Sequence, residues 1–189
     1  RFIAGETVTE AIAAARALEA QGMGHTLDLL GENVTTLEAA DAATRAYLEV
    51  VDAIAQAGIE RNISLKLTQL GLGIDRATCV DNLRRILEPA AQHQFFVRID
   101  MENSPYTEAT LQVFETVWGL EFRNVGIALQ SSLFRTEQDV RRMTELGARV
   151  RLVKGAYKEP SSVAFQQKTD VDASYLRQMR LLLDHGVSA

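Results

Sequence analysis

The stretch Arg149-Val-Arg-Leu-Val-Lys-Gly-Ala-Tyr-Lys-Glu-Pro160 begins with the alternation of a strand and ends as a loop. Val150 and Leu152 alternate with Arg149, Arg151 and Val153 until a glycine stops the pattern, which is typical of a short strand that leads into a loop. Arg151 and Lys154 lie at this strand end, followed by a glycine, an alanine and a tyrosine. Two cations beside small residues offer several donors and close backbone approach to an anion or an electron-rich ring. Taken alone, the stretch is also compatible with a solvated strand end.

The rest of the chain alternates strands with helices. Apolar periodicity and capping residues predict helices over residues 6–20, 36–57, 76–92, 107–118, 137–146 and 170–185. Strands are predicted over residues 25–30, 62–67, 95–100, 125–130 and 149–153, and a sixth begins at 186–187. This alternation predicts parallel βαβ units with right-handed crossovers. The sequence contains only three prolines and no low-complexity stretch that would mark a linker, so we predict a single domain over residues 1–189.

Two architectures fit this order, an open doubly wound sheet and a closed barrel. The Gly71-Leu-Gly73 pair does not complete the dinucleotide-binding fingerprint that would favour the open sheet. Polar or charged residues instead stand at or near every strand end: Asp28, Glu32, Lys66, Asp100, Gln130, Arg151 and Lys154. A barrel brings such residues together on its catalytic face. We therefore predict an α/β fold of the (β/α)8 TIM-barrel type, with about five to six of the eight strands in this chain.

Composition excludes several classes of function. The net charge is −5, and no run of basic residues is longer than Arg141-Arg142, which argues against a nucleic-acid partner. A single cysteine, Cys79, indicates a reduced thiol in a cytoplasmic protein. With three histidines and no Cys/His spacing, we expect no metal site. No apolar run approaches the roughly 18 residues of a membrane span.

Lys66 lies in the apolar run Ser-Leu-Lys-Leu-Thr, so its ammonium needs a partner, and Asp100 at the end of the next strand is the nearest candidate. A purely structural ion pair would show the same pattern. Gln130 is suited either to a ring amide or to capping its own strand. Asp28 and Glu32 are expected to hold cations in place rather than to react.

Five motifs in order carry a resemblance: Asp28-Leu-Leu-Gly-Glu32, Ser64-Leu-Lys66-Leu-Thr68, Arg98-Ile-Asp100-Met101-Glu102, Gln130-Ser-Ser-Leu133 and Arg151-Leu-Val-Lys154-Gly-Ala-Tyr157. Together they resemble proline dehydrogenase, the flavin-dependent barrel of bacterial and mitochondrial proline catabolism. The match extends over nearly the whole chain, and the last motif is the most specific.

The resemblance implies roles for individual residues. Asp100 and Arg151 match catalytic positions, with Arg151 near the reactive end of the flavin. Lys66 matches the lysine that helps to hold the substrate carboxylate, and Tyr157 matches a pocket wall. The implied FAD contacts are Met101, Gln130, Arg151, Lys154, Gly155 and Ala156.

The implied reaction is the oxidation of L-proline to 1-pyrroline-5-carboxylate, with hydride transfer from proline C5 to N5 of FAD. Electrons then pass to a quinone, so the expected location is cytoplasmic with peripheral contact at the inner face of the membrane. The family also carries a tyrosine and an Arg-Arg-x-x-Glu pattern after the eighth strand, whereas this sequence ends at Ala189. We therefore expect the central part of such an enzyme, whose unpaired barrel edges favour oligomers.

Two alternatives stay open. An aldolase-type barrel would use Lys66 or Lys154 as a Schiff-base nucleophile, which needs a lysine that loses its proton. A non-catalytic half-barrel would instead associate through its open sheet edges and carry no chromophore.

Overall fold

A computed structural model describes residues 3–185. The chain forms two compact units, Arg1–Arg98 and Ile99–Ala189, and each is described by itself. That residues 1–189 act as a single domain stays a prediction.

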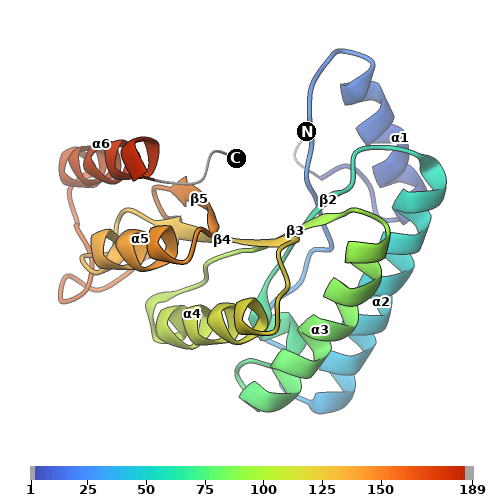
Figure 1. Cartoon of the computed structure of the whole chain (residues 1–189), viewed down its shortest axis with the longest axis horizontal. Coiled ribbons are helices and arrows are strands. Elements are labelled where there is room, and N and C mark those ends of the chain that lie inside the picture. The colour runs from blue at the N-terminus through green and yellow to red at the C-terminus, as the bar shows by residue number, and fades with distance from the viewer. Residues whose placement is uncertain (1–2, 186–189) are drawn as a thin grey trace. The chain divides into compact units, whose positions relative to one another are not determined.

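The first unit is built from two long helices and short strands (Figure 1). Its elements are α1 (Val8–Glu19), β1 (Leu27–Asp28), α2 (Leu37–Ala57), β2 (Asn62–Leu65), the 3-10 helix η1 (Leu67–Leu70), α3 (Arg76–Gln92) and β3 (Phe96–Ile99), the last of which ends at the first residue of the second unit. β1 pairs in parallel with β2, with Asp28 opposite Ser64. α2 and α3 lie side by side (Figure 1).

Helix α2 shows how the sequence places a polar group in the core. Thr36 caps its start through the backbone N–H of Ala39, and Gly58 ends it in the left-handed conformation with φ 68°. Its buried residues recur every three or four positions and form one stripe: Ala40, Thr44, Tyr47, Val51 and Ile54. Tyr47 therefore enters the core at the middle of the helix, with its hydroxyl group.

All three strands of this unit are shorter than predicted, and β3 covers Phe96–Ile99 rather than residues 95–100. The strand expected over residues 25–30 is reduced to Leu27–Asp28, and the one expected to reach residue 67 ends at Leu65. The chain turns instead into η1, all four of whose residues are buried. Gly71 closes this turn with φ 100°, a conformation that glycine adopts readily, and its N–H donates to the carbonyls of Leu67 and Thr68. Apolar periodicity does not separate a buried 3-10 turn from a continuing strand.

The second unit consists of α4 (Ser104–Gly119), β4 (Val125–Gln130), α5 (Thr136–Glu145), β5 (Arg149–Val153) and α6 (Lys168–His185). β4 is buried along its whole length, as expected of a parallel strand covered on both faces. It pairs in parallel with β5 from Gly126 opposite Arg149 to Gln130 opposite Val153. The predicted α/β class with parallel strands is confirmed.

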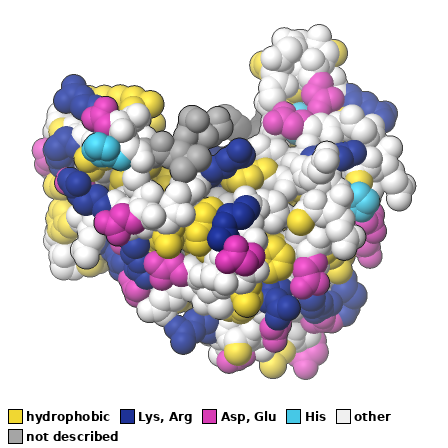
Figure 2. Space-filling model, in the orientation of Figure 1, with side chains coloured by type: hydrophobic (Ala, Val, Ile, Leu, Met, Phe, Trp, Pro, Cys, Tyr) yellow, Lys and Arg dark blue, Asp and Glu magenta, His cyan; other side chains and the backbone are white. Residues whose placement is uncertain are grey.

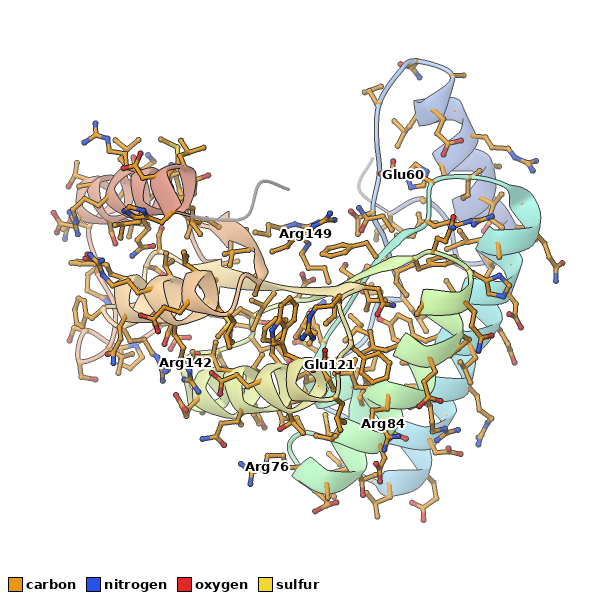
Figure 3. All side chains as sticks on the ribbon, viewed as in Figure 1. Glu60, Arg76, Arg84, Glu121, Arg142 and Arg149 are labelled. Atoms are coloured by element: carbon orange, nitrogen blue, oxygen red, sulfur yellow. The ribbon has the colours of Figure 1, made fainter. Side chains whose placement is uncertain are left out.

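Helices α4 and α5 are joined by charged side chains. Arg142, labelled in Figure 3 where α5 faces α4, donates from Nη2 to Oε2 of Glu115 at 2.6 Å. Arg135, just before α5, binds Asp139 through two nitrogens and Glu108 of α4 through Nη2. Such bidentate contacts fix the angle between two helices better than single charges do.

Helix α6 has an unusual distribution of side chains. Its buried residues are the polar Ser174 and Gln178, whereas Leu176 and Leu183 are exposed. Figure 2 shows hydrophobic side chains at the surface in the upper left, where Figure 1 places this helix. The sixth strand predicted at residues 186–187 lies outside the described residues. Among residues 3–185, none of the helices has the length and apolar character of a membrane span.

Candidate functional site

Charged and amide side chains follow the strands at the predicted places. Asp28 is the last residue of β1, Gln130 is the last residue of β4, and Lys66, Asp100 and Lys154 come directly after β2, β3 and β5. Side chains at the carboxyl ends of parallel strands are presented to solvent at one edge of a sheet. The strand-end residues of each unit are therefore the candidate site residues.

In the second unit, Arg151 and Asp100 form an ion pair. Nη1 of Arg151 lies 3.8 Å from Oδ1 of Asp100, and the two side chains are 37% and 26% exposed. This distance is longer than a normal hydrogen bond, so the attraction between these two atoms is electrostatic. Arg151 thus places a guanidinium group beside a carboxylate at this strand end.

Gln130 connects the end of β4 to the segment after β3. Its side-chain Nε2 donates to the backbone carbonyl of Glu102 at 2.8 Å, and its own carbonyl accepts from the hydroxyl of Thr136. The hydroxyl of Thr136 thus binds the backbone carbonyl at the end of the strand, whereas the side-chain amide of Gln130 binds Glu102. Both Gln130 and Met101 beside Glu102 are buried.

Gly155 brings the loop after β5 close to the end of β4. Its φ is 104°, and a Cβ atom built there would lie 2.4 Å from Oγ of Ser132. The backbone N–H of Ser132 also donates to the carbonyl of Lys154 at 2.9 Å. Lys154, Gly155 and Ala156 are nevertheless exposed on their other side. The loop therefore offers a close-lying, solvent-facing backbone that a larger residue at position 155 would displace.

Lys154 is paired with a residue that the sequence did not indicate. Its Nζ lies 2.6 Å from Oδ1 of Asp172 on α6, and Lys168 contacts the same carboxylate. The hydrogen bond from Lys154, followed by that from Lys168, lowers the pKa of Asp172 below its usual value. Asp172 therefore stays ionised and holds the ammonium beside the loop. Tyr157 follows in the same loop and is half-buried.

In the first unit, Lys66 is paired with Asp28. Nζ of Lys66 lies 3.3 Å from Oδ2 of Asp28, and the Lys66 side chain is 18% exposed between the buried Leu65 and Leu67. The expectation that Asp28 holds a cation is confirmed. The predicted pair of Lys66 with Asp100 joins residues of different units and stays a prediction.

Beneath this ion pair lies Tyr47, which the sequence analysis did not identify. Its fully buried hydroxyl is 3.3 Å from Oδ1 of Asp28, 3.2 Å from the carbonyl of Ser64 and 3.3 Å from Oε1 of Gln69. The single hydroxyl proton is shared among these acceptors. An apolar stripe on a helix predicts that such a residue is buried but not which polar groups it meets.

Comparison with known proteins decides the family. The sequence model of the proline dehydrogenase family matches residues 11–188. The chain belongs to the proline dehydrogenase family. Proline dehydrogenase 2 of Bacillus subtilis is 37% identical over 186 residues, which are 98% of this chain and 61% of that protein. Proline dehydrogenase of Deinococcus radiodurans is 38% identical over 182 residues, 94% of this chain and 58% of that protein.

A solved structure supports the fold. The crystal structure of proline utilization A from Bdellovibrio bacteriovorus, inactivated by N-propargylglycine, matches with a TM-score of 0.88 and 26% identity. It covers 97% of this chain, which corresponds to 24% of that chain. The predicted TIM-barrel type of α/β fold is thereby confirmed, with five parallel strands among the described residues. The chain spans 61% of the length of the Bacillus protein.

Proposed function

We propose that this chain forms the flavin-binding and part of the substrate-binding region of an enzyme that oxidises L-proline to 1-pyrroline-5-carboxylate. The observation that carries the proposal is the exposed backbone of residues 154–156, which lies next to the cations Arg151 and Lys154 in a chain of the proline dehydrogenase family. Cations and backbone donors on one loop suit an electron-rich ring that carries carbonyl groups.

The residues present fit FAD by the chemistry of their donors. We assign its contacts to Met101, Gln130, Arg151, Lys154, Gly155 and Ala156. When bound, FAD would accept the hydride that leaves the substrate. Arg151 supplies a fixed positive charge where negative charge develops, and a preorganised charge costs no reorganisation during the reaction. Gly155 lets the backbone approach closely, because a Cβ there would displace Ser132.

On the substrate side, we assign Lys66 to the proline carboxylate and Tyr157 to the wall of the pocket. Asp28 lies 3.3 Å from the Lys66 ammonium and holds it in place, and an ammonium group binds a carboxylate. Oxidation removes a hydride from C5 and a proton from the ring nitrogen, and Asp100 is the catalytic residue that we place beside this change. The electron acceptor that we propose is a quinone, which requires a cytoplasmic protein to touch the membrane surface. Association through open barrel edges belongs to the same proposal.

The Schiff-base alternative is not supported by the geometry around Lys66. A nucleophilic lysine must lose its proton, whereas a carboxylate at 3.3 Å favours the charged ammonium. Lys154 likewise has an ionised carboxylate, that of Asp172, at 2.6 Å. The absorbance experiment described next distinguishes the half-barrel alternative from the flavoenzyme.

The deciding experiment is an absorbance spectrum of the purified full-length protein, followed by anaerobic addition of L-proline. A flavin spectrum that bleaches with proline establishes cofactor and substrate together. A flavin spectrum that proline leaves unchanged contradicts the substrate assignment and keeps the cofactor assignment. Folded protein without a visible chromophore, even after incubation with FAD, overturns the proposal in favour of the half-barrel.

Two variants then locate the roles within the site. Arg151→Met should lower the flavin reduction potential and the rate of reduction by proline, because the reduced, negatively charged flavin loses a cation. Arg149→Met is the matched control, since Arg149 is an exposed arginine on the same strand and is labelled in Figure 3. Lys66→Ala should mainly raise the KM for proline. An unchanged potential in Arg151→Met would remove this residue from the cofactor site.

A further inference from the structure

The carboxylate of Glu159 reaches from the loop after β5 to the first residue of α4. The backbone N–H of Ser104 donates to Oε1 at 2.7 Å, and the hydroxyl of Ser104 donates to Oε2 at 2.5 Å. Both oxygens of one carboxylate are therefore used by one residue, 55 positions away in the sequence. Short contacts of this kind to an ionised group are among the stronger hydrogen bonds in proteins.

This contact gives the first turn of helix α4 a side-chain partner. The N-cap residue Asn103 makes no capping hydrogen bond with its side chain within the described structure, and Pro105 follows Ser104 at the start of the helix. The first N–H groups of a helix have no partner inside the helix and carry a partial positive charge. Glu159 therefore serves as a helix cap supplied from another part of the chain.

The contact joins two segments that carry candidate site residues. Ser104 comes shortly after Asp100 and Met101, at the end of β3, and Glu159 comes two residues after Tyr157. One end of the loop after β5 is held by Gly155, whose backbone lies against Ser132. Glu159 holds the other end of the stretch 154–158, so that this stretch is fixed on both sides.

The part of the loop beyond Glu159 is also tied down. The N–H of Phe165 donates to the carbonyl of Ser132 at 2.9 Å, and the N–H of Phe134 donates to the carbonyl of Val163 at 3.0 Å. These backbone contacts hold residues 163–165 but not the stretch 154–158. The side chain of Glu159 links the stretch 154–158 to the first residue of α4.

We propose that Glu159 is a positioning residue, which holds the cofactor segment 154–156 against the start of α4 and thereby sets the affinity for flavin. This inference rests on the proposed function, because it assigns residues 154–156 to FAD. Glu159 touches neither substrate nor cofactor in this scheme. It acts through the backbone of the loop and through the first turn of α4.

The test compares Glu159→Ala with the wild type in the full-length protein. FAD dissociation, followed by the recovery of flavin fluorescence on dilution, should show a dissociation constant raised roughly tenfold, because two hydrogen bonds to a charged group are lost. Hydrogen exchange in the flavin-free protein should become faster at the amides of residues 154–158. Wild-type FAD affinity and unchanged exchange in a folded variant would overturn the proposal.

Two further variants separate positioning from folding. Ser104→Ala removes one of the two contacts without touching the loop, so it should show a smaller loss of affinity, and the double variant should add little to Glu159→Ala. Glu121→Ala is the control, because Glu121 is an exposed glutamate of the same unit and is labelled in Figure 3. A lower Tm with unchanged FAD affinity would show a merely structural cap and overturn the proposal. If the wild type binds no flavin, the proposed function fails, while exchange at residues 154–158 still decides whether the loop is held.

Discussion

The two regions that carry candidate site residues are held in place by different means. In the first unit, Lys66 is held by the side chain of Asp28, which in turn contacts the fully buried hydroxyl of Tyr47. In the second unit, Lys154, Gly155 and Ala156 lie in an exposed loop. The backbone of this loop is held against Ser132 and by the carboxylate of Glu159, whereas Asp172 holds only the side chain of Lys154.

The difference predicts how each region responds to mutation. A residue held by several side-chain hydrogen bonds becomes gradually less well ordered, because each deleted hydroxyl or carboxylate removes only one contact. A position fixed by backbone conformation responds abruptly, because one Cβ atom in the wrong place moves the whole loop. Substitutions of equal size should therefore affect the loop more than the Lys66 region.

The largest effect is expected from Gly155→Ala. At φ 104° an alanine is strained, and its Cβ would lie 2.4 Å from Oγ of Ser132. We expect a destabilisation of roughly 3 kcal/mol together with loss of bound flavin, because strain and overpacking act at the same position. The measurements are the Tm and the ratio of flavin to protein after purification.

Gly58→Ala is the matched control for this change. Gly58 also has a positive φ, 68°, but no atom lies within 4 Å of the position of its added Cβ. Its substitution should cost about 1 kcal/mol from backbone strain alone and should leave the flavin content unchanged. Equal losses in the two variants would show that strain, and not contact with Ser132, accounts for the effect at position 155.

An intermediate effect is expected from Tyr47→Phe. The change removes one buried hydroxyl that lies near Asp28, Ser64 and Gln69 and leaves the ring in place. The KM for proline should rise by roughly a factor of five, because Asp28 and with it Lys66 become less well ordered. The rate of flavin reduction at saturating proline should change much less.

Tyr106→Phe serves as the control, since Tyr106 lies on α4 and has no assigned role in the site. A rise in KM for Tyr47→Phe that is matched by Tyr106→Phe would contradict the role of Tyr47. The comparison of regions would be contradicted as well if Tyr47→Phe lowered flavin content as strongly as Gly155→Ala. Steady-state kinetics and flavin content therefore test both regions with the same samples.

Much of the fold could be predicted from the sequence because its elements carry strong local signals. The helix over residues 76–92 and the strand over residues 125–130 were predicted with their observed bounds. β4 is apolar throughout, and α3 begins after Asp75, whose carboxylate accepts from the N–H of Thr78. The order of the polar residues at the strand ends followed from the same periodicity, although β1, β2 and β3 end earlier than it predicted.

The partners of the candidate residues could not be predicted, because they come from distant parts of the chain. Tyr47 sits in a helix whose apolar stripe indicates burial only. Asp172 lies on α6 and Glu159 in an irregular loop, and neither has a local pattern that names Lys154 or Ser104 as its partner. Such contacts depend on how helices pack onto strands, which periodicity does not encode.

The smallest effect is expected from Glu108→Gln, which alters the contact between α4 and α5 rather than either region. The hydrogen bond from Arg135 is the main cause that lowers the pKa of Glu108 below its usual value of 4.5. A carboxyl group whose pKa is lower in the folded state stabilises that state above its unfolded pKa, and this contribution is lost as the pH falls through the folded value. The side chain is 46% exposed, so we expect less than about 1 kcal/mol at neutral pH.

The difference in unfolding free energy between the wild type and Glu108→Gln, measured by urea denaturation, should therefore be largest near neutral pH and should shrink below about pH 4.5. It should also decrease in high salt, because a half-exposed ion pair is screened. Flavin affinity and the KM for proline should not change, since Glu108 joins α4 to α5 and contacts none of the candidate site residues through Arg135 or Arg142. A pH-independent difference would mean that the charge of Glu108 does not stabilise the fold. A change in flavin affinity would mean that a shift of α4 relative to α5 reaches the loop through Ser104 and Glu159. The position of the loop would then depend on these two helices as well as on its own backbone.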